Sequence, residues 1–173
     1  MPLGASRLSF LAKTTEEEVP VITSRVPLSI SAFGNAQVDT AQSQFGGASV
    51  LLDGTGDYLQ SQETSEMTFG TGDFTMEAWI RLTNLTNEAI LSGRKISSSS
   101  FGDSANVLRV NSGKLGWSNG QAFIETGVLI SLNTWHHVAV TRESGTLRLF
   151  VDGSVESTTT QTVDIAGNIL HVG

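Results

Sequence analysis

The feature that most constrains the fold is the stretch from Trp135 to Gly153, WHHVAVTRESGTLRLFVDG. Its first half, up to Thr141, is rich in aromatic and β-branched residues, which suit a pleated, half-buried surface. In its second half every other residue is apolar, as expected for a strand with one buried face. Ser144 and Gly145 lie between the halves, and glycine readily adopts the positive φ of a tight turn. The stretch therefore predicts a β-hairpin.

The rest of the chain repeats this pattern of short strands separated by turns. Asp73 to Leu82 is the clearest strand, because every second residue from Phe74 is apolar. The Asn119-Gly120 pair is strongly suited to a type I′ turn. No segment supports a helix of ordinary length, and about ten short strands at regular spacing predict an all-β sandwich or jelly roll. The other expected strands are Val26–Phe33, Ala48–Leu52, Asp57–Gln60, Glu88–Ser92, Asn106–Val110, Lys114–Ser118, Gln121–Glu125, Thr158–Val163 and Ile169–Val172.

Composition excludes several classes of protein. The net charge is −7, so no basic face is expected to neutralise the phosphates of a nucleic acid or of an anionic membrane. The chain has no cysteine, so it can form neither a disulfide nor a thiolate metal site. No apolar run reaches the roughly 18 residues of a membrane-spanning helix. We expect no nucleic-acid partner and no membrane partner.

Residues 1–25 differ in composition from residues 26–173, which we assign to the sandwich. They contain three consecutive glutamates and two of the chain's three prolines. Leu8 and Phe10 are among their apolar side chains, which a purely solvated tail would not need, so we interpret the segment as an extended arm or anchor. A floppy terminus is an equally good interpretation. The apolar patch Leu8–Ala12 is too short for a signal-peptide core.

Several motifs together resemble a known family. These are SVLLDGTGDY from Ser49, FGTGDFTMEAWI from Phe69, AILSG from Ala89, and the hairpin at Trp135. Over roughly residues 45–173 the chain resembles the concanavalin A-like, laminin-G-like domains. The resemblance implies a jelly roll of two antiparallel sheets, usually a non-catalytic recognition module for sugars or proteins. A weaker resemblance, at the head of the chain, is to structural proteins of marine bacteriophages.

The resemblance also implies one further strand after Gly173, pairing near the ASVLL strand. Without that strand the sheet would have an unpaired inner edge, which is an aggregation hazard. Either the sequence is a fragment, or Val26–Phe33 or a neighbouring subunit fills the gap by strand addition. The fragment is the simpler explanation.

Catalytic groups are poorly supported. Glucanases that share the implied fold need paired carboxylates on one strand, whereas Glu77 stands without one two or four residues away except Asp73. His136 and His137 are adjacent on a strand, so they point to opposite faces and cannot grip one zinc ion together. Ser, His and Asp are all present, but no G-x-S-x-G nucleophile elbow occurs. We expect no enzyme.

Calcium is the one plausible cofactor, because turns supply the hard oxygen ligands that it prefers. Asp53 and Asp57 bracket a Gly-Thr-Gly turn, and Asp73 opens the next long strand. In domains of the family that the chain resembles, calcium sits near such turns. The simpler alternative, which we favour, is that each aspartate caps its own turn.

Sugar recognition needs an exposed aromatic side chain with polar neighbours. Trp117, beside Asn119 and Gln121, is our first candidate, and Phe101 lies in a polar loop from Lys95 to Asp103. A core position for Trp117 is an equally good interpretation, and Trp79 and Trp135 are expected in the core.

Two functions remain. The chain is a phage virion component, anchored to virion proteins or to copies of itself by its arm, with a sandwich that faces a host-surface glycan. Alternatively, it is a carbohydrate-binding module of a bacterial secreted or surface protein. The expected location is accordingly the virion or the cell exterior.

Overall fold

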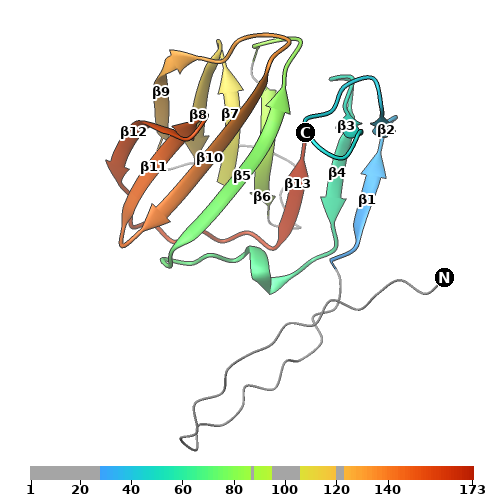
Figure 1. The fold of residues 1–173 in the computed structure, drawn as a ribbon. Coiled ribbons are helices and arrows are strands. Elements are labelled where there is room, and N and C mark those ends of the chain that lie inside the picture. The colour runs from blue at the N-terminus through green and yellow to red at the C-terminus, as the bar shows by residue number, and fades with distance from the viewer. Residues whose placement is uncertain (1–27, 87, 95–105, 120–122) are drawn as a thin grey trace, which may run out of the picture.

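The computed structural model describes residues 28–86, 88–94, 106–119 and 123–173. These residues form an almost entirely β structure in which two antiparallel sheets face each other, as Figure 1 shows. The predicted jelly-roll sandwich is therefore confirmed. The strands are β1 (Ile30–Phe33), β2 (Gln37–Asp39), β3 (Ser49–Leu51), β4 (Tyr58–Ser61), β5 (Phe74–Arg81), β6 (Glu88–Arg94), β7 (Asn106–Asn111), β8 (Lys114–Ser118), β9 (Phe123–Leu129), β10 (Trp135–Glu143), β11 (Thr146–Val151), β12 (Ser154–Thr160) and β13 (Ile169–Val172), with a 3-10 turn at Ser65–Met67.

The larger sheet has seven strands in the order β1-β4-β13-β6-β7-β8-β9, and the smaller has four in the order β12-β11-β10-β5. A third pair, β2 with β3, lies at one end of the molecule beside β4 and β1 (Figure 1). Every recorded strand pair is antiparallel. Antiparallel sheets commonly bury one face and expose the other, so the two larger sheets can share one core between them.

The hairpin at Trp135 forms as predicted. β10 pairs with β11 so that Val140 is opposite Leu149, and Ser144 and Gly145 both have positive φ in the connecting turn. On its other side β10 pairs with β5, and His137 is opposite Trp79. The hairpin therefore forms the centre of the four-stranded sheet.

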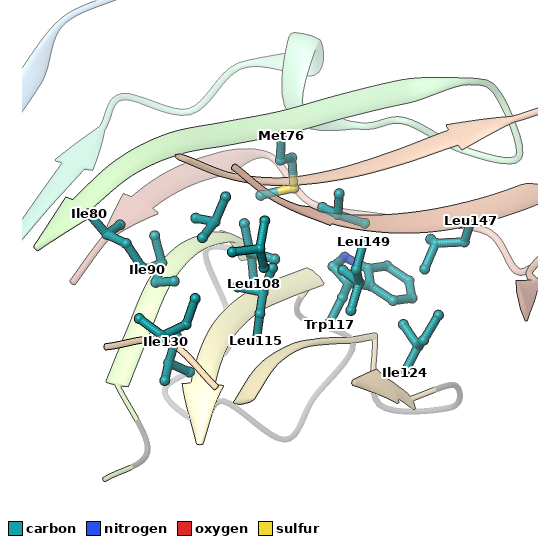
Figure 2. Close-up of a cluster of buried hydrophobic side chains, with 14 of the residues drawn as sticks. Met76, Ile80, Ile90, Leu108, Leu115, Trp117, Ile124, Ile130, Leu147 and Leu149 are labelled. Atoms are coloured by element: carbon teal, nitrogen blue, oxygen red, sulfur yellow. The ribbon is translucent and has the colours of Figure 1, made fainter. Parts of the chain in front are cut away.

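The core lies between the two sheets. Met76 and Ile80 of β5 point toward Leu108, Leu115 and neighbouring side chains of the larger sheet (Figure 2). Burying one such side chain stabilises the fold by roughly 1.5–3 kcal/mol. The apolar face predicted for Asp73–Leu82 is therefore the face of β5 that packs in the core.

The segment Val26–Phe33 does not occupy the position beside ASVLL. Its described part forms β1, which pairs with β4 at the edge of the seven-stranded sheet. The ASVLL segment contributes β3, which pairs with β2. Among the described residues, no strand pairs with β5 on the side away from β10. The suggestion that Val26–Phe33 fills the gap was therefore wrong, because the described part of this segment pairs with β4 and not with β3.

Other differences are local. The predicted Thr158–Val163 strand is displaced toward the hairpin, because β12 begins directly after the Asp152-Gly153 turn. β2 was not predicted. Residues 1–25 and the Lys95–Asp103 loop lie outside the described residues. Within the described ranges, no helix is long and apolar enough to cross a membrane.

Candidate functional site

A groove of about 380 Å³ lies along the free edge of β5. Its lining residues come from β2, β3 and their connection, from the end of β5 and from the end of β13, so segments far apart in the sequence meet there. Apolar groups line its floor, and Asp39, Gln42 and Arg81 bring polar groups to it. The lining residues are Asp39, Gln42, Ser49, Val50, Leu51, Leu52, Ala78, Trp79, Ile80, Arg81, Leu82, Thr83, Ala89, Ile90, Trp135, Val172 and Gly173.

Two aromatic residues form what we call the Trp79 platform, consisting of Trp79 and Phe45. Trp79 is 40% exposed and Phe45 is 66% exposed. Their rings meet edge to face, with centroids 5.5 Å apart and an interplanar angle of 83°. Trp79 also lines the groove, so the platform adjoins it. Large aromatic surface exposed in this way is available to stack against a flat apolar ligand face.

Polar side chains surround this platform on the outer face of the four-stranded sheet. The His137 ring lies beside Trp79, with centroids 5.4 Å apart, because the two residues are register partners on β10 and β5. His137 Nε2 is 3.6 Å from Glu77 Oε2. Hydrogen-bonding groups therefore lie near the indole: Glu77 and His137 on the sheet, and Asp39, Gln42 and Arg81 among the groove-lining residues.

This arrangement suits binding better than glycoside hydrolysis. Hydrolysis by the usual mechanism needs two carboxyl groups about 5 to 10 Å apart around the scissile bond. Asp39 is the sole acidic side chain among the groove-lining residues, and its Oδ1 accepts the Ala41 backbone N–H at 3.1 Å. The groove lining does not provide the carboxylate pair.

The ligand-binding residues predicted from sequence are not brought together here. Trp117 is 0% exposed and belongs to the core, as Figure 2 shows. Its ring centroid lies 6.3 Å from that of Phe74. That prediction was wrong because β8 turns the Trp117 side chain inward, between the sheets. Asn119 is also buried. Phe101 and Gln121 lie outside the described residues.

The three predicted metal ligands do not all lie together. Asp53 and Asp57 lie together near β4, whereas Asp73 precedes β5 and accepts the Ser144 backbone N–H on Oδ1 at 2.8 Å. Asp57 is buried and accepts the backbone N–H groups of Asn35 and Asp53, both at 2.8 Å. Each aspartate therefore caps a turn, as the simpler alternative proposed.

The turn at Asp53 and Asp57 does not fit a calcium site well. Asp53 accepts Thr55 N–H on Oδ1 at 2.7 Å and the Asn35 amide on Oδ2 at 3.0 Å. All four carboxylate oxygens thus face N–H donors, whose positive ends occupy directions that a cation would need. These bonds, Thr55 N–H first, hold the pKa of Asp53 below its ordinary value. Among the described residues no three acidic, histidine or cysteine side chains could hold a metal ion together.

The residues of the platform were assigned otherwise from sequence. Trp79 was expected in the core, and Phe45 was not among the candidates. A usable signal was present, because Trp79 alternates with Thr75, Glu77 and Arg81 on the polar face of β5. An indole on that face is exposed unless another layer covers it. The partner ring of Phe45 could not be foreseen, since it depends on how the β2–β3 connection packs.

Several solved structures share this architecture. Domain 4 of AbnA, a GH43 extracellular arabinanase from Geobacillus stearothermophilus, was solved with arabinotriose; its TM-score is 0.57 at 15% identity, covering 85% of this chain and 73% of that one. Mouse laminin alpha1 domains LG4-5 have a TM-score of 0.51 at 17% identity, covering 67% of this chain and 31% of theirs. The heptameric SAP-like pentraxin of Limulus polyphemus has a TM-score of 0.50 at 20% identity, covering 67% of this chain and 57% of its own. At these identities the likeness concerns the fold.

No curated protein matches the sequence. A family model does match it over residues 53–173, which is most of the chain and includes every strand from β4 to β13. The model describes the concanavalin A-like lectin/glucanases superfamily. This family is the one that the motifs at Ser49, Phe69, Ala89 and Trp135 resemble. The chain belongs to the concanavalin A-like lectin/glucanase superfamily.

Proposed function

We propose that the protein is a carbohydrate-recognition module that binds a neutral oligosaccharide at the Trp79 platform without hydrolysing it. The observation that carries this proposal is the exposure of Trp79 beside a groove with polar lining residues. A sugar ring has an apolar face, which stacks on an indole, and a rim of hydroxyl groups, which need hydrogen-bond partners. Trp79 and Phe45 supply aromatic rings for the apolar face. Asp39, Gln42 and Arg81 supply hydrogen-bonding groups for the hydroxyl rim.

Charge favours a neutral ligand over an acidic polysaccharide. The net charge of −7 repels polyanions at long range, and Asp39 and Glu77 add negative charge near the platform. A carboxylate can accept hydrogen bonds from two hydroxyl groups of a neutral sugar. The arabinotriose held by the AbnA domain is an example of such a ligand on a similar fold.

Titration of the full chain with arabinotriose and a panel of neutral oligosaccharides tests the proposal. Trp79→Ala should weaken binding at least about tenfold, equivalent to about 1.4 kcal/mol. Phe123→Ala is the matched control, because Phe123 is also an exposed aromatic residue but lies on β9 of the other sheet. Wild-type protein that binds no member of the panel, or a Trp79→Ala variant that binds as well as the wild type, would contradict the proposal.

The virion location stays a prediction that rests on the sequence of residues 1–25. Removing these residues and following particle assembly or oligomer formation tests it. Loss of assembly with an intact sandwich would support an anchoring arm. Unchanged behaviour, together with glycan binding by the shortened chain, would favour a module of a secreted or surface protein.

A further inference from the structure

A chain of three hydrogen-bonding side chains lies at the rim of the four-stranded sheet, apart from the Trp79 platform. Ser131 is in the connection between β9 and β10, His136 is the second residue of β10, and Asp152 directly follows β11. His136 and His137 point to opposite faces, so that His137 joins the platform while His136 faces the rim. The register of β10 with β11 brings Asp152 next to the start of β10, since Val138 is opposite Val151.

The three side chains form a continuous hydrogen-bonded relay. Ser131 Oγ is 2.8 Å from His136 Nε2. His136 Nδ1 is 2.7 Å from Asp152 Oδ2. A serine, an imidazole and a carboxylate linked in this order constitute the arrangement by which an imidazole activates a serine hydroxyl, and it is recognised by geometry and not by sequence position.

The tautomer that this chemistry requires follows from a fourth group. The backbone N–H of Ser131 also points at His136 Nε2, at 3.4 Å, and an N–H can only donate. In the neutral imidazole Nε2 is therefore the acceptor, so the proton is on Nδ1 and is donated to Asp152. The lone pair on Nε2 is then the base that faces the Ser131 hydroxyl.

The carboxylate of this relay is held in place independently of the imidazole. Asp152 Oδ1 accepts the His137 backbone N–H at 2.9 Å, and the Asp152 N–H donates to the His137 carbonyl at 2.8 Å. Burial raises the pKa of Asp152, but the bonds from His136 and His137 outweigh it and lower the pKa overall. A fixed, ionised carboxylate orients the imidazole and stabilises the imidazolium formed when it takes a proton.

The relay is accessible from solvent at its serine end. Ser131 and the three residues that follow it are all exposed. The N–H of Leu132 has no recorded acceptor among the described residues, whereas that of Asn133 donates to Leu82. In acyl-transfer enzymes the N–H of the residue after the nucleophile commonly stabilises the oxyanion. An ester could therefore approach Ser131 from outside.

We propose that Ser131 is an activated nucleophile that cleaves esters at this rim. The Ser131 hydroxyl proton passes to His136 Nε2 while Oγ forms a bond to the carbonyl carbon. The ester C–O bond then breaks, and the alcohol leaves with the proton from His136. Water, deprotonated by the same nitrogen, releases the acid and restores the serine. The activity is separate from glycan recognition, so the failure of one leaves the other intact.

A fluorophosphonate probe tests the proposal on the full chain. Its reaction forms a bond from Ser131 Oγ to phosphorus and releases fluoride with the serine proton. We expect one adduct per chain, located at Ser131 by peptide mass spectrometry, together with release of p-nitrophenol from p-nitrophenyl acetate. Ser131→Ala should abolish both signals. Ser144→Ala, which removes an exposed serine from the hairpin turn, is the matched control and should change neither.

Asp152→Asn separates activation from structure. An asparagine oxygen can still accept the His137 N–H, but its amide cannot accept the proton of His136 Nδ1. We expect the variant to remain folded in urea titrations while labelling becomes at least about 100-fold slower. No adduct at Ser131, labelling no faster than that of a serine in a free peptide, or a Ser131→Ala variant with undiminished ester cleavage would each overturn the proposal and leave the relay a purely structural clamp of the rim.

Discussion

Arg142 on β10 and Phe74 on β5 are register partners, and the Arg142 guanidinium carbon lies 5.1 Å from the centre of the Phe74 ring. The guanidinium is almost completely buried at the end of the sandwich opposite the His136 rim. It donates from Nη2 to the Gly70 carbonyl at 2.7 Å and from Nε to the Gly72 carbonyl at 2.8 Å. From Nη1 it donates to Gln161 Oε1 and to the Val163 carbonyl. One side chain thus ties two connecting segments to the four-stranded sheet.

Arg142→Ala should destabilise the fold by about 3 kcal/mol or more, because it leaves several buried acceptors without a donor. Arg142→Lys should recover part of this loss, since an ammonium group cannot reach all of the same acceptors. Urea unfolding midpoints measure both effects. The control is Arg148→Ala, which breaks the exposed pair with Glu143 at 3.2 Å and should cost less than about 1 kcal/mol. Equal effects at the two positions would contradict the assigned role of Arg142.

A second prediction concerns the turn that attaches β1 to β4. Asp57→Ala should cost about 2 kcal/mol, because the N–H groups of Asn35 and Asp53 lose their acceptor. Gly34→Ala should also destabilise this end of the sheet, since Gly34 has a φ of 68° and an added Cβ would lie 2.2 Å from Asp57 Oδ1. Urea unfolding again provides the measurement. The matched control, Gly153→Ala, tests a positive φ without a nearby clash and should cost less.

Calcium should not act through this turn. Because Asp53 and Asp57 already accept N–H donors on every oxygen, millimolar calcium chloride should leave the Tm of the protein unchanged. Magnesium chloride at equal ionic strength is the control. A rise in Tm with calcium alone, abolished by Asp53→Asn, would show that the turn rearranges around the ion.

The fourth prediction separates two tryptophans that the sequence ranked in the wrong order. Trp117→Ala should cost about 3–5 kcal/mol, because it empties a large site in the core. Trp79→Ala should change stability by less than about 1 kcal/mol while it weakens glycan binding at least about tenfold. Urea unfolding and glycan titration on the same two variants check this. A Trp117→Phe variant that keeps the fold but loses binding would restore the original assignment.

The sequence was sufficient to predict the sandwich but not its candidate binding surface. Alternation along Asp73–Leu82 and the turn at Gly145 are local properties, so the positions of β5, β10 and β11 could be predicted. The exposure of Trp79 and the burial of Trp117 depend on which face of each strand meets the other sheet. For Trp79 the polar neighbours Glu77 and Arg81 indicated exposure, but the general preference of tryptophan for the interior was given more weight. For Trp117 the sequence left the core and the surface equally open.

The rim relay illustrates a second limit. Ser131, His136 and Asp152 form no spacing motif, and the sequence excluded only a zinc site shared by His136 and His137. Their contact depends on the register between β10 and β11 and on the course of the connection after β9, both of which are tertiary. The burial of Arg142 could not be predicted either, because a charged residue at the end of a strand is ordinarily expected at the surface.

The last prediction concerns the pH dependence of stability. The pKa of Asp152 is lowered in the folded protein from its ordinary value of 3.8. A group with a lowered folded pKa contributes stability above its unfolded pKa and loses that contribution as the pH falls through its folded pKa. Wild-type protein should therefore lose stability as the pH falls below about 4, and Asp152→Asn should lose less over the same interval.

Urea unfolding at pH 7, 5 and 3 measures this difference. Asp53→Asn is the parallel variant, because the pKa of Asp53 is also lowered, in this case chiefly by the Thr55 N–H. Asp53→Asn should likewise reduce the loss of stability between pH 5 and pH 3. Asp152→Asn, however, should in addition slow the reaction of Ser131 with the fluorophosphonate probe, whereas Asp53→Asn should not. An Asp152→Asn profile parallel to that of the wild type between pH 5 and pH 3 would show that the bonds from His136 and His137 do not stabilise the ionised carboxylate.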